Sequence, residues 1–304
     1  MPEPRIIVHI GMHKTGTTLI QRMLRTNREL LLAAGVLHPS AGIPPGHNNA
    51  HRGLLHALRH VDGGQWETLA AEVNRAGVST AVISNEEFSR CTEVEVALIR
   101  DKLREFDARI LVYVRNEWDF MLAACRQNWK AGIYGGTLRG FLDANIERCD
   151  YARYIDRWVD VFGFERVSVV LYDKVAAEPG LVDDFVGRLG LRTDVERVVR
   201  TALVRHHKLV NASVDDDVAM TQGRITALED RLPDRVTRGG SLQRLRRHLN
   251  RQTPTGRALV AVARPRRPMY TDDDRDWLRD RTATWHQRFL DRFVDPVDHH
   301  FLDF

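Results

Sequence analysis

The chain has 304 residues, of which 43% are hydrophobic and 8% aromatic, a composition typical of globular proteins. This length allows one large α/β domain or two small ones. The formal net charge of +4 does not indicate a nucleic-acid partner, and the lack of a long apolar run predicts no transmembrane helix.

The cysteines indicate a reducing compartment. Cys91, Cys125 and Cys149 are few, odd in number and widely spaced, unlike a disulfide framework or a zinc site. The chain also enters its first predicted strand without the charged start and long apolar core of a signal peptide. We therefore expect a cytoplasmic protein without a metal site.

The first predicted strand leads into a turn suited to an anion. Ile6–Ile10 is an apolar run typical of a short buried strand, and Leu19, Met23 and Leu24 recur at helical spacing. The turn between them, Gly11–Thr18, contains glycine, lysine and threonine. A strand that turns sharply into a helix directs backbone N–H groups at the space above the helix N-terminus. The turn therefore predicts a site for a phosphate or sulfate group.

The order of residues in this turn differs from the loop of nucleoside triphosphatases. That loop has its lysine directly after the second glycine. Here Lys14 precedes Gly16, and Thr17 and Thr18 follow the glycine. No strand ends in an obvious aspartate for magnesium either. The sequence therefore does not favour a magnesium-dependent triphosphatase.

Strands and helices alternate through the first half of the chain. After a loop rich in proline and glycine, the predicted elements are helices at Leu54–Leu58 and Trp66–Val73, a strand at Ser79–Ser84, a helix at Val94–Phe106, and strands at Ala108–Val114 and Val167–Tyr172. This alternation is typical of an α/β fold with a mostly parallel sheet flanked by helices. Ligands of such sheets bind at the carboxyl ends of the strands.

The C-terminal part of the chain is predicted to be helical. The clearest helices are expected at Val214–Arg231 and Asp272–Phe293. The segment Arg224–Arg267 between them has many arginines, no lysine and few acidic residues. We interpret it as an exposed helical face or as a source of positive field for an anionic ligand. No recognised module for nucleic-acid binding accompanies it.

A second anion anchor is predicted where the strand Ala108–Val114 ends. Arg115 follows this strand directly, and a helix begins behind it. The planar guanidinium of arginine can hold a phosphate through two hydrogen bonds. The alternative is an ion pair with a carboxylate on a helix surface. Glu86 likewise follows a strand, so we expect Glu86, Arg115 and the Gly11–Thr18 turn to meet in one crevice.

These motifs resemble those of sulfotransferases, which use 3′-phosphoadenosine 5′-phosphosulfate (PAPS). The Gly11–Thr18 turn resembles the 5′-phosphosulfate loop of that family. The family's second signature is a strand, an arginine and a helix, in which the arginine and a serine eight residues later hold the 3′-phosphate. Arg115 fits, but the later position is Ala123, which removes a hydroxyl donor worth roughly 0.5–1.5 kcal/mol. Further fragments resembling bacterial sulfotransferases are Gly35–Pro39, Val82–Ser89, Arg126–Gly132, Asp150–Trp158, Phe162–Gly163, Val169–Tyr172 and Val210–Ser213.

The resemblance extends over about residues 5–215. It implies a P-loop-like sulfotransferase fold in one domain over residues 1–304, with a helical, arginine-rich cover over about residues 216–304. The implied reaction moves a sulfuryl group from PAPS to a hydroxyl or amine of a carbohydrate, lipid or secondary metabolite. No metal is required, because a lysine and a helix N-terminus supply positive charge.

The resemblance also implies which residues bind the donor. They are His13, Lys14, Thr15, Gly16, Thr17, Thr18 and Arg115. Lys14 is the expected catalytic cation, which neutralises charge on the bridging oxygen as the bond to sulfur breaks.

A general base must take the proton of the acceptor. Glu86 is the first candidate, because it follows a strand and resembles the carboxylate found there in carbohydrate-modifying sulfotransferases. Its neighbour Glu87 is the second, and His47 and His51 in the loop before the strand are the rivals, since histidine titrates near neutral pH. Each of the four also has a purely structural interpretation, as a helix cap or an exposed loop residue.

Acceptor contacts are expected on the helix after Arg115 and in the loop that contains His51. Gln127 and Lys130 are three residues apart and share a helix face, which either lines the acceptor site or faces solvent. Two other functions stay open. A P-loop kinase would transfer phosphate from ATP, and a non-catalytic binding module would keep the fold without tight donor binding, as Ala123 allows.

Overall fold

A computed structural model shows a five-stranded sheet flanked by helices. The structure describes residues 3–45, 50–60, 64–178, 180–191, 196–197, 199–200, 216–229 and 269–304. They form two compact units. The first comprises the described residues of Met1–Asn116, Asp150–Val210 and Gln287–Asp303, and the second those of Glu117–Cys149, Asn211–His286 and Phe304.

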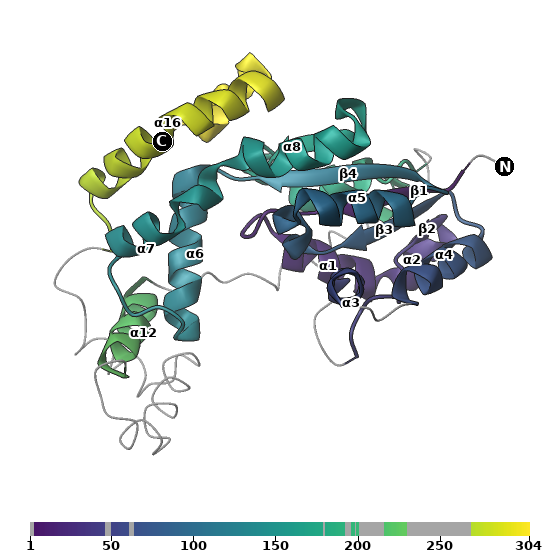
Figure 1. Cartoon of the computed structure of the whole chain (residues 1–304), viewed down its shortest axis with the longest axis horizontal. Coiled ribbons are helices and arrows are strands. Elements are labelled where there is room, and N and C mark those ends of the chain that lie inside the picture. The colour runs from purple at the N-terminus through teal and green to yellow at the C-terminus, as the bar shows by residue number, and fades with distance from the viewer. Residues whose placement is uncertain are drawn as a thin grey trace. The chain divides into compact units, whose positions relative to one another are not determined.

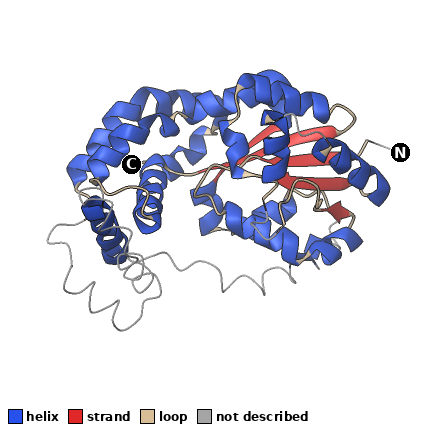
Figure 2. Ribbon diagram, turned by 60° about the horizontal axis from the view of Figure 1, so that its bottom comes forward, coloured by secondary structure: helices blue, strands red, loops and turns tan. Residues whose placement is uncertain are grey.

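The first unit contains the sheet. Its strands are β1 (Arg5–His9), β2 (Val36–Leu37), β3 (Thr80–Ser84), β4 (Asp107–Val114) and β5 (Val167–Leu171). All pairings are parallel, and the strand order is β2-β3-β1-β4-β5. The predicted α/β fold with a parallel sheet is therefore confirmed, and Figure 2 shows the strands in red between layers of helices. The edge strand β2 was not predicted, because two residues are too short to display a strand period.

Helices of the first unit cover both faces of this sheet. They are α1 (Thr17–Thr26), α2 (Arg28–Ala33), α3 (Arg52–Arg59), α4 (Gln65–Ala76), α5 (Glu93–Lys102), α8 (Tyr151–Phe162), α9 (Tyr172–Ala177) and α10 (Leu181–Gly187), with shorter 3₁₀ turns at Glu86–Arg90, Phe164–Arg166 and Pro296–Leu302.

The hydrophobic core of this unit lies on both faces of the sheet, because successive side chains of each strand point to opposite faces. Ile7, Leu111 and Tyr113 point to one face, where they pack against Leu24 of α1 and Phe185 of α10. Their chain neighbours point to the other face, because successive side chains of a strand alternate. On that face α8 packs against β4 and α5. The continuous apolar runs of the sequence therefore reflect burial on both sides.

The second unit is helical. It contains α6 (Glu117–Ala131), α7 (Leu138–Asn145), a 3₁₀ turn at Ile146–Cys149 and α12 (Asp216–Glu229). Helix α12 packs closely on α6, as Figure 1 shows, because Gly223 has no side chain. A Cβ at this glycine would lie 2.6 Å from Cδ1 of Trp129.

One long helix contributes residues to both units. It is α16 (Asp272–Phe293), which has the bounds predicted from the sequence. The other predicted C-terminal helix, Val214–Arg231, corresponds over its described residues to α12. The predicted Val94–Phe106 helix ends earlier than expected, since α5 stops at Lys102 and turns into β4. Most of the arginine-rich segment lies outside the described residues, as does the fragment Val210–Ser213.

The three cysteines are buried and unpaired. Burial raises the pKa of the Cys91 and Cys125 thiols to about 12, so both stay protonated at neutral pH. None of the described helices is long and apolar enough to cross a membrane.

Candidate functional site

The turn after β1 has the geometry of an anion-binding loop. Gly16 precedes α1 in the left-handed conformation, with φ of 76°, and among the described residues no side chain caps this helix. The first backbone N–H groups of a helix have no partner within the helix, so they point toward the space above it. Lys14 also has a positive φ, of 69°, and no other described residue except glycine does. A strained backbone of this kind is concentrated at ligand sites.

Close packing leaves no room for a side chain at Gly11 or Gly16 of this loop. A Cβ on Gly16 would lie 2.2 Å from Cδ2 of Leu181, and one on Gly11 would lie 2.5 Å from Cγ2 of Thr17. Thr15 is buried and donates its hydroxyl to the carbonyl of Met12 at 2.6 Å. The loop is thus held by its own Thr15 and Thr17 and by Leu181 of α10.

The predicted phosphate anchor contacts this loop. Nη1 of Arg115 lies 3.5 Å from the carbonyl oxygen of Lys14. Its Nε lies 3.7 Å from Oδ1 of Asp173, and its guanidinium lies 5.5 Å from the ring centre of Tyr172. The structure therefore brings Arg115 and the Gly11–Thr18 loop together, as the sequence predicted. The ion pair that the sequence left as an alternative is present as well.

The topology explains why these two elements meet. β1 and β4 are neighbours in the sheet, but the chain runs from β1 toward β2 on one side and from β4 to β5 on the other. Such a switch point opens a crevice at the carboxyl ends of the two strands, where ligands of α/β sheets bind. The loop follows β1 and Arg115 follows β4, so both border this switch point.

Glu86 lies at the carboxyl end of the neighbouring strand β3, in the 3₁₀ turn. Its side chain is only 14% exposed, and Oε1 accepts a hydrogen bond from Nη2 of Arg52 at 3.1 Å. Oε2 accepts one from Nε2 of Gln21 on α1 at 2.8 Å. Burial alone raises the pKa of Glu86, but the bonds from Gln21 and Arg52 outweigh it and lower the pKa. Glu86 is therefore an ionised carboxylate at neutral pH.

Glu87 contacts the loop from another direction. Its Oε1 lies 3.3 Å from Nε2 of His13, and Arg90 is the next cation, at 4.0 Å. The hydrogen bond with His13 lowers the pKa of Glu87 despite partial burial. The sequence predicted that only one of the two glutamates faces the crevice. In the structure Glu86 contacts Gln21 and Arg52, whereas Glu87 contacts His13.

His51 is fully buried, and both of its ring nitrogens contact the backbone. Nδ1 accepts a hydrogen bond from the N–H of Ser84 at 3.1 Å, and Nε2 lies 3.2 Å from the carbonyl of Pro39. Burial lowers the pKa of His51 to about 4. This placement does not favour a role as base or substrate contact, because neither nitrogen is available to a ligand. The rival histidine, His47, lies outside the described residues.

Two of the three predicted acceptor contacts belong to the second unit, and the third, His51, belongs to the first. Gln127 and Lys130 are both exposed on α6. Ala123, which replaces the expected serine, is half-buried on the same helix. The roles of Gln127 and Lys130 stay predictions.

Three buried polar residues near Glu86 were not identified from the sequence. Gln21 donates to Glu86 and also to Oγ of Ser84, at 3.3 Å. The same Oγ lies 2.8 Å from Nδ1 of His9 on β1. The available signal was a polar residue at an apolar position: His9 interrupts the first apolar run, and Gln21 lies within the buried stripe of α1.

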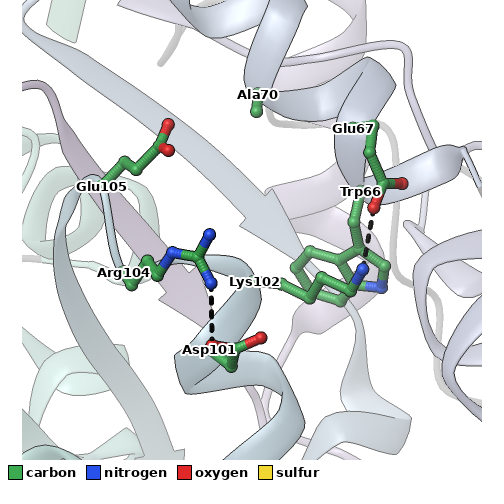
Figure 3. A pocket seen from close by; sticks show the side chains of 7 residues that line it. All are labelled: Trp66, Glu67, Ala70, Asp101, Lys102, Arg104 and Glu105. Carbon is green, nitrogen blue, oxygen red and sulfur yellow. Dashed lines mark hydrogen bonds and ion pairs between the residues drawn. The ribbon is translucent and has the colours of Figure 1, made fainter.

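A pocket of about 290 Å³ lies elsewhere on the first unit, between α4 and the end of α5. Figure 3 shows that four of its ionic side chains form pairs, Lys102 with Glu67 at 2.8 Å and Arg104 with Asp101 at 3.1 Å. None of the predicted site residues lines it. We therefore place the candidate site at the strand ends.

Known proteins were compared with this chain by sequence and by structure. No protein-family model matches the chain, and no curated protein matches it. The chain does match solved sulfotransferases.

One match is the crystal structure of a sulfotransferase from Alicyclobacillus acidocaldarius, with 18% identity and a TM-score of 0.41, over 67% of this chain and 93% of that one. Another is the mouse sulfotransferase SULT7A1 in complex with PAP, with 14% identity and a TM-score of 0.39, over 84% of this chain and 88% of that one. At these identities and TM-scores the likeness assigns no activity to this chain and no role to any residue.

Proposed function

We propose that this protein transfers a sulfuryl group from PAPS to a hydroxyl or amine of a carbohydrate, lipid or secondary metabolite. The observation that carries the proposal is the contact of Arg115 with the Gly11–Thr18 loop, at 3.5 Å from Nη1 to the Lys14 carbonyl. It places two different anion-binding elements side by side. PAPS carries anionic groups at two separate positions, the 5′-phosphosulfate and the 3′-phosphate, and so offers one group to each element. ATP carries all of its phosphates in one chain.

The residues of the loop fit the 5′ end of the donor. The backbone from Thr15 to Thr18 supplies N–H groups at an uncapped helix N-terminus, where the helix dipole adds positive potential. A side chain on Gly16 would collide with Leu181, so the packing of the loop against α10 requires a glycine here. Thr18 is exposed, while Thr15 and Thr17 are buried. Arg115 would hold the 3′-phosphate with its planar guanidinium.

When bound, PAPS supplies a sulfuryl group attached to a phosphate leaving group. The task of the protein is to position the reactants and to stabilise the charge that develops. Lys14 would supply a cation that neutralises the charge developing on the leaving phosphate. His13 shapes the loop through its contact with Glu87.

Glu86 is the base in this proposal. Its carboxylate is ionised at neutral pH and therefore ready to accept a proton from the acceptor. A carboxylate with a lowered pKa is a weak base, so its contribution depends on its position beside the acceptor. His51 has no available nitrogen, Glu86 keeps the first place that its position after β3 gives it, and Glu87, which contacts His13, stays the second candidate.

Isothermal titration calorimetry tests the donor. Adenosine 3′,5′-bisphosphate and ATP are titrated separately, each with magnesium and with EDTA. We expect the bisphosphate to bind in EDTA and ATP to bind more weakly. Binding of ATP with magnesium alone would instead support a kinase, and binding of neither nucleotide would support a non-catalytic module.

Replacing Lys14 tests the reaction. Lys14→Ala is expected to lower the transfer of labelled sulfate from PAPS at least 100-fold, in line with the loss of one charge-stabilising group. The assay uses a panel of 2-naphthol, N-acetylglucosamine and an alkylamine as acceptors. Lys102→Ala is the matched control, because Lys102 pairs with Glu67 at the pocket between α4 and α5. Equal transfer by the Lys14→Ala variant and the wild type would refute the assigned role.

A further inference from the structure

We propose that Gln21 is a positioning residue that holds the carboxylate of Glu86 in place for the proton of the acceptor. The inference rests on the proposed function, in which Glu86 is the base. Gln21 lies on α1, directly behind the donor loop, and Glu86 lies after β3. The residue therefore connects the element that binds the donor to the element that carries the base.

Both hydrogens of the Gln21 amide are used. Nε2 lies 2.8 Å from Oε2 of Glu86 and 3.3 Å from Oγ of Ser84. An ionised carboxylate only accepts hydrogen bonds, so the amide must present its nitrogen to Glu86. Gln21 is only 4% exposed, so both contacts are buried. Its geometry is consequently determined by these two contacts.

The second contact anchors Gln21 to the sheet. Oγ of Ser84 lies 2.8 Å from Nδ1 of His9, and the N–H of Ser84 donates to Nδ1 of His51 at 3.1 Å. All three of these residues are fully buried. Buried hydrogen bonds thus connect the amide of Gln21 to β1 and β3. Glu86 is the last residue in this series of hydrogen bonds.

Arg52, on α3, is the other donor to Glu86. It contributes less to positioning, because its side chain is 49% exposed and its bond, at 3.1 Å, is the longer of the two. An exposed arginine also loses much of its electrostatic effect to solvent. The remaining titratable groups nearby are His9, whose pKa burial lowers to about 4, and Glu87, which pairs with His13. His9 is therefore neutral, and the buried donor to Glu86 is Gln21.

The experiment is the Gln21→Met variant, which keeps the length of the side chain and removes its donor. Turnover is measured against pH with the panel acceptor that the wild type uses fastest. We expect kcat to fall about tenfold, as a lost hydrogen bond to a charged group predicts, with KM for PAPS within about twofold of the wild type. The acid limb of the kcat profile is expected to move to higher pH, because Glu86 loses a bond to its charged form.

Gln287→Met is the matched control. Gln287 also donates to a carboxylate, Oδ1 of Asp291, at 2.7 Å, but it is exposed on α16. This variant is expected to keep both kcat and the pH profile of the wild type. An unchanged kcat and an unmoved acid limb in Gln21→Met would overturn the proposal.

A second readout does not depend on turnover. Carbon-13 NMR of the labelled Glu86 carboxyl group records its titration midpoint, which we expect at higher pH in Gln21→Met than in the wild type. An equal midpoint would overturn the proposal, even if no panel acceptor is sulfated. Absence of sulfation by the wild type would count against the proposed function alone. If Gln21→Met does not fold, Ser84→Ala replaces it, with a smaller shift expected in the same direction and no shift as the contradicting result.

Discussion

Replacing Gly16 with alanine separates the two physical reasons for a glycine at the start of α1. The residue has φ of 76°, and a Cβ would lie 2.2 Å from Cδ2 of Leu181. Non-bonded carbon atoms attract most strongly at about 3.5–4.0 Å, so Leu181 must move by more than about 1 Å or α1 must shift. Leu181 belongs to the main core cluster and is only 7% exposed, so this movement disturbs packed neighbours.

The loss of stability in Gly16→Ala has two contributions, the left-handed backbone and the collision with Leu181. A non-glycine residue in the left-handed conformation costs roughly 1–2 kcal/mol. Insertion of a methyl group into a packed core costs about 1–3 kcal/mol more. We therefore expect Gly16→Ala to lower the free energy of unfolding by roughly 2–5 kcal/mol.

Urea denaturation followed by circular dichroism measures this loss, with Gly77→Ala as the matched control. Gly77 is also left-handed, with φ of 60°, but nothing lies within 4 Å of the position that an alanine methyl group would take there. This control has the backbone strain without the collision, so it should lose only about 1–2 kcal/mol. If Gly16→Ala is no more destabilising than Gly77→Ala, the reasoning about Leu181 is wrong.

Two further predictions concern the phosphate anchor and the pH dependence of stability. Arg115→Lys is expected to weaken binding of adenosine 3′,5′-bisphosphate roughly 10–100-fold by calorimetry, since lysine lacks the planar fork, while Arg109→Lys on the same strand leaves the affinity unchanged. Equal affinities of these two variants would contradict the role of Arg115. Burial alone raises the pKa of Glu72, but hydrogen bonds from the Ser40 and Ala41 N–H groups and the Arg28 charge lower it overall. Ionised Glu72 therefore stabilises the fold at pH values above its pKa in the unfolded chain, and this stabilisation is lost as the pH falls through its lower pKa in the folded chain. Glu72→Gln should lower the free energy of unfolding by roughly 1–2 kcal/mol at pH 7 and make that free energy depend less on pH on the acid side. A stability curve of unchanged slope in this variant would show that Glu72 does not cause the dependence.

The sequence predicted those parts of the fold and site that depend on local pattern. Apolar runs located β1, β3, β4 and β5, since strands buried on both faces contain few polar residues. The positions of Arg115 and Glu86 after strands were sufficient to place both at the carboxyl edge of a parallel sheet. The strand order, which makes β1 and β4 neighbours, decides that Arg115 meets the loop.

The parts that were missed depend on contacts between distant segments. His51 was a candidate base because histidine titrates near neutral pH, and the sequence could not show that both of its ring nitrogens contact the backbone, at Ser84 and Pro39. Gln21 was not considered, because its partner Glu86 is far along the chain. A local pattern contains no information about such partners. A polar residue inside an apolar stripe is a signal that a partner exists, but it does not identify which residue that partner is.

The left-handed backbone of Lys14 has a consequence for how this loop can change. A glycine at this position would adopt the same φ without strain, so the folded chain would gain stability from the loss of the lysine side chain. Selection for stability alone would therefore remove the one ammonium group in the loop. In the proposed function the charge of Lys14 serves the donor, so a library screened for thermal stability should replace Lys14 early while one screened for sulfation should keep it.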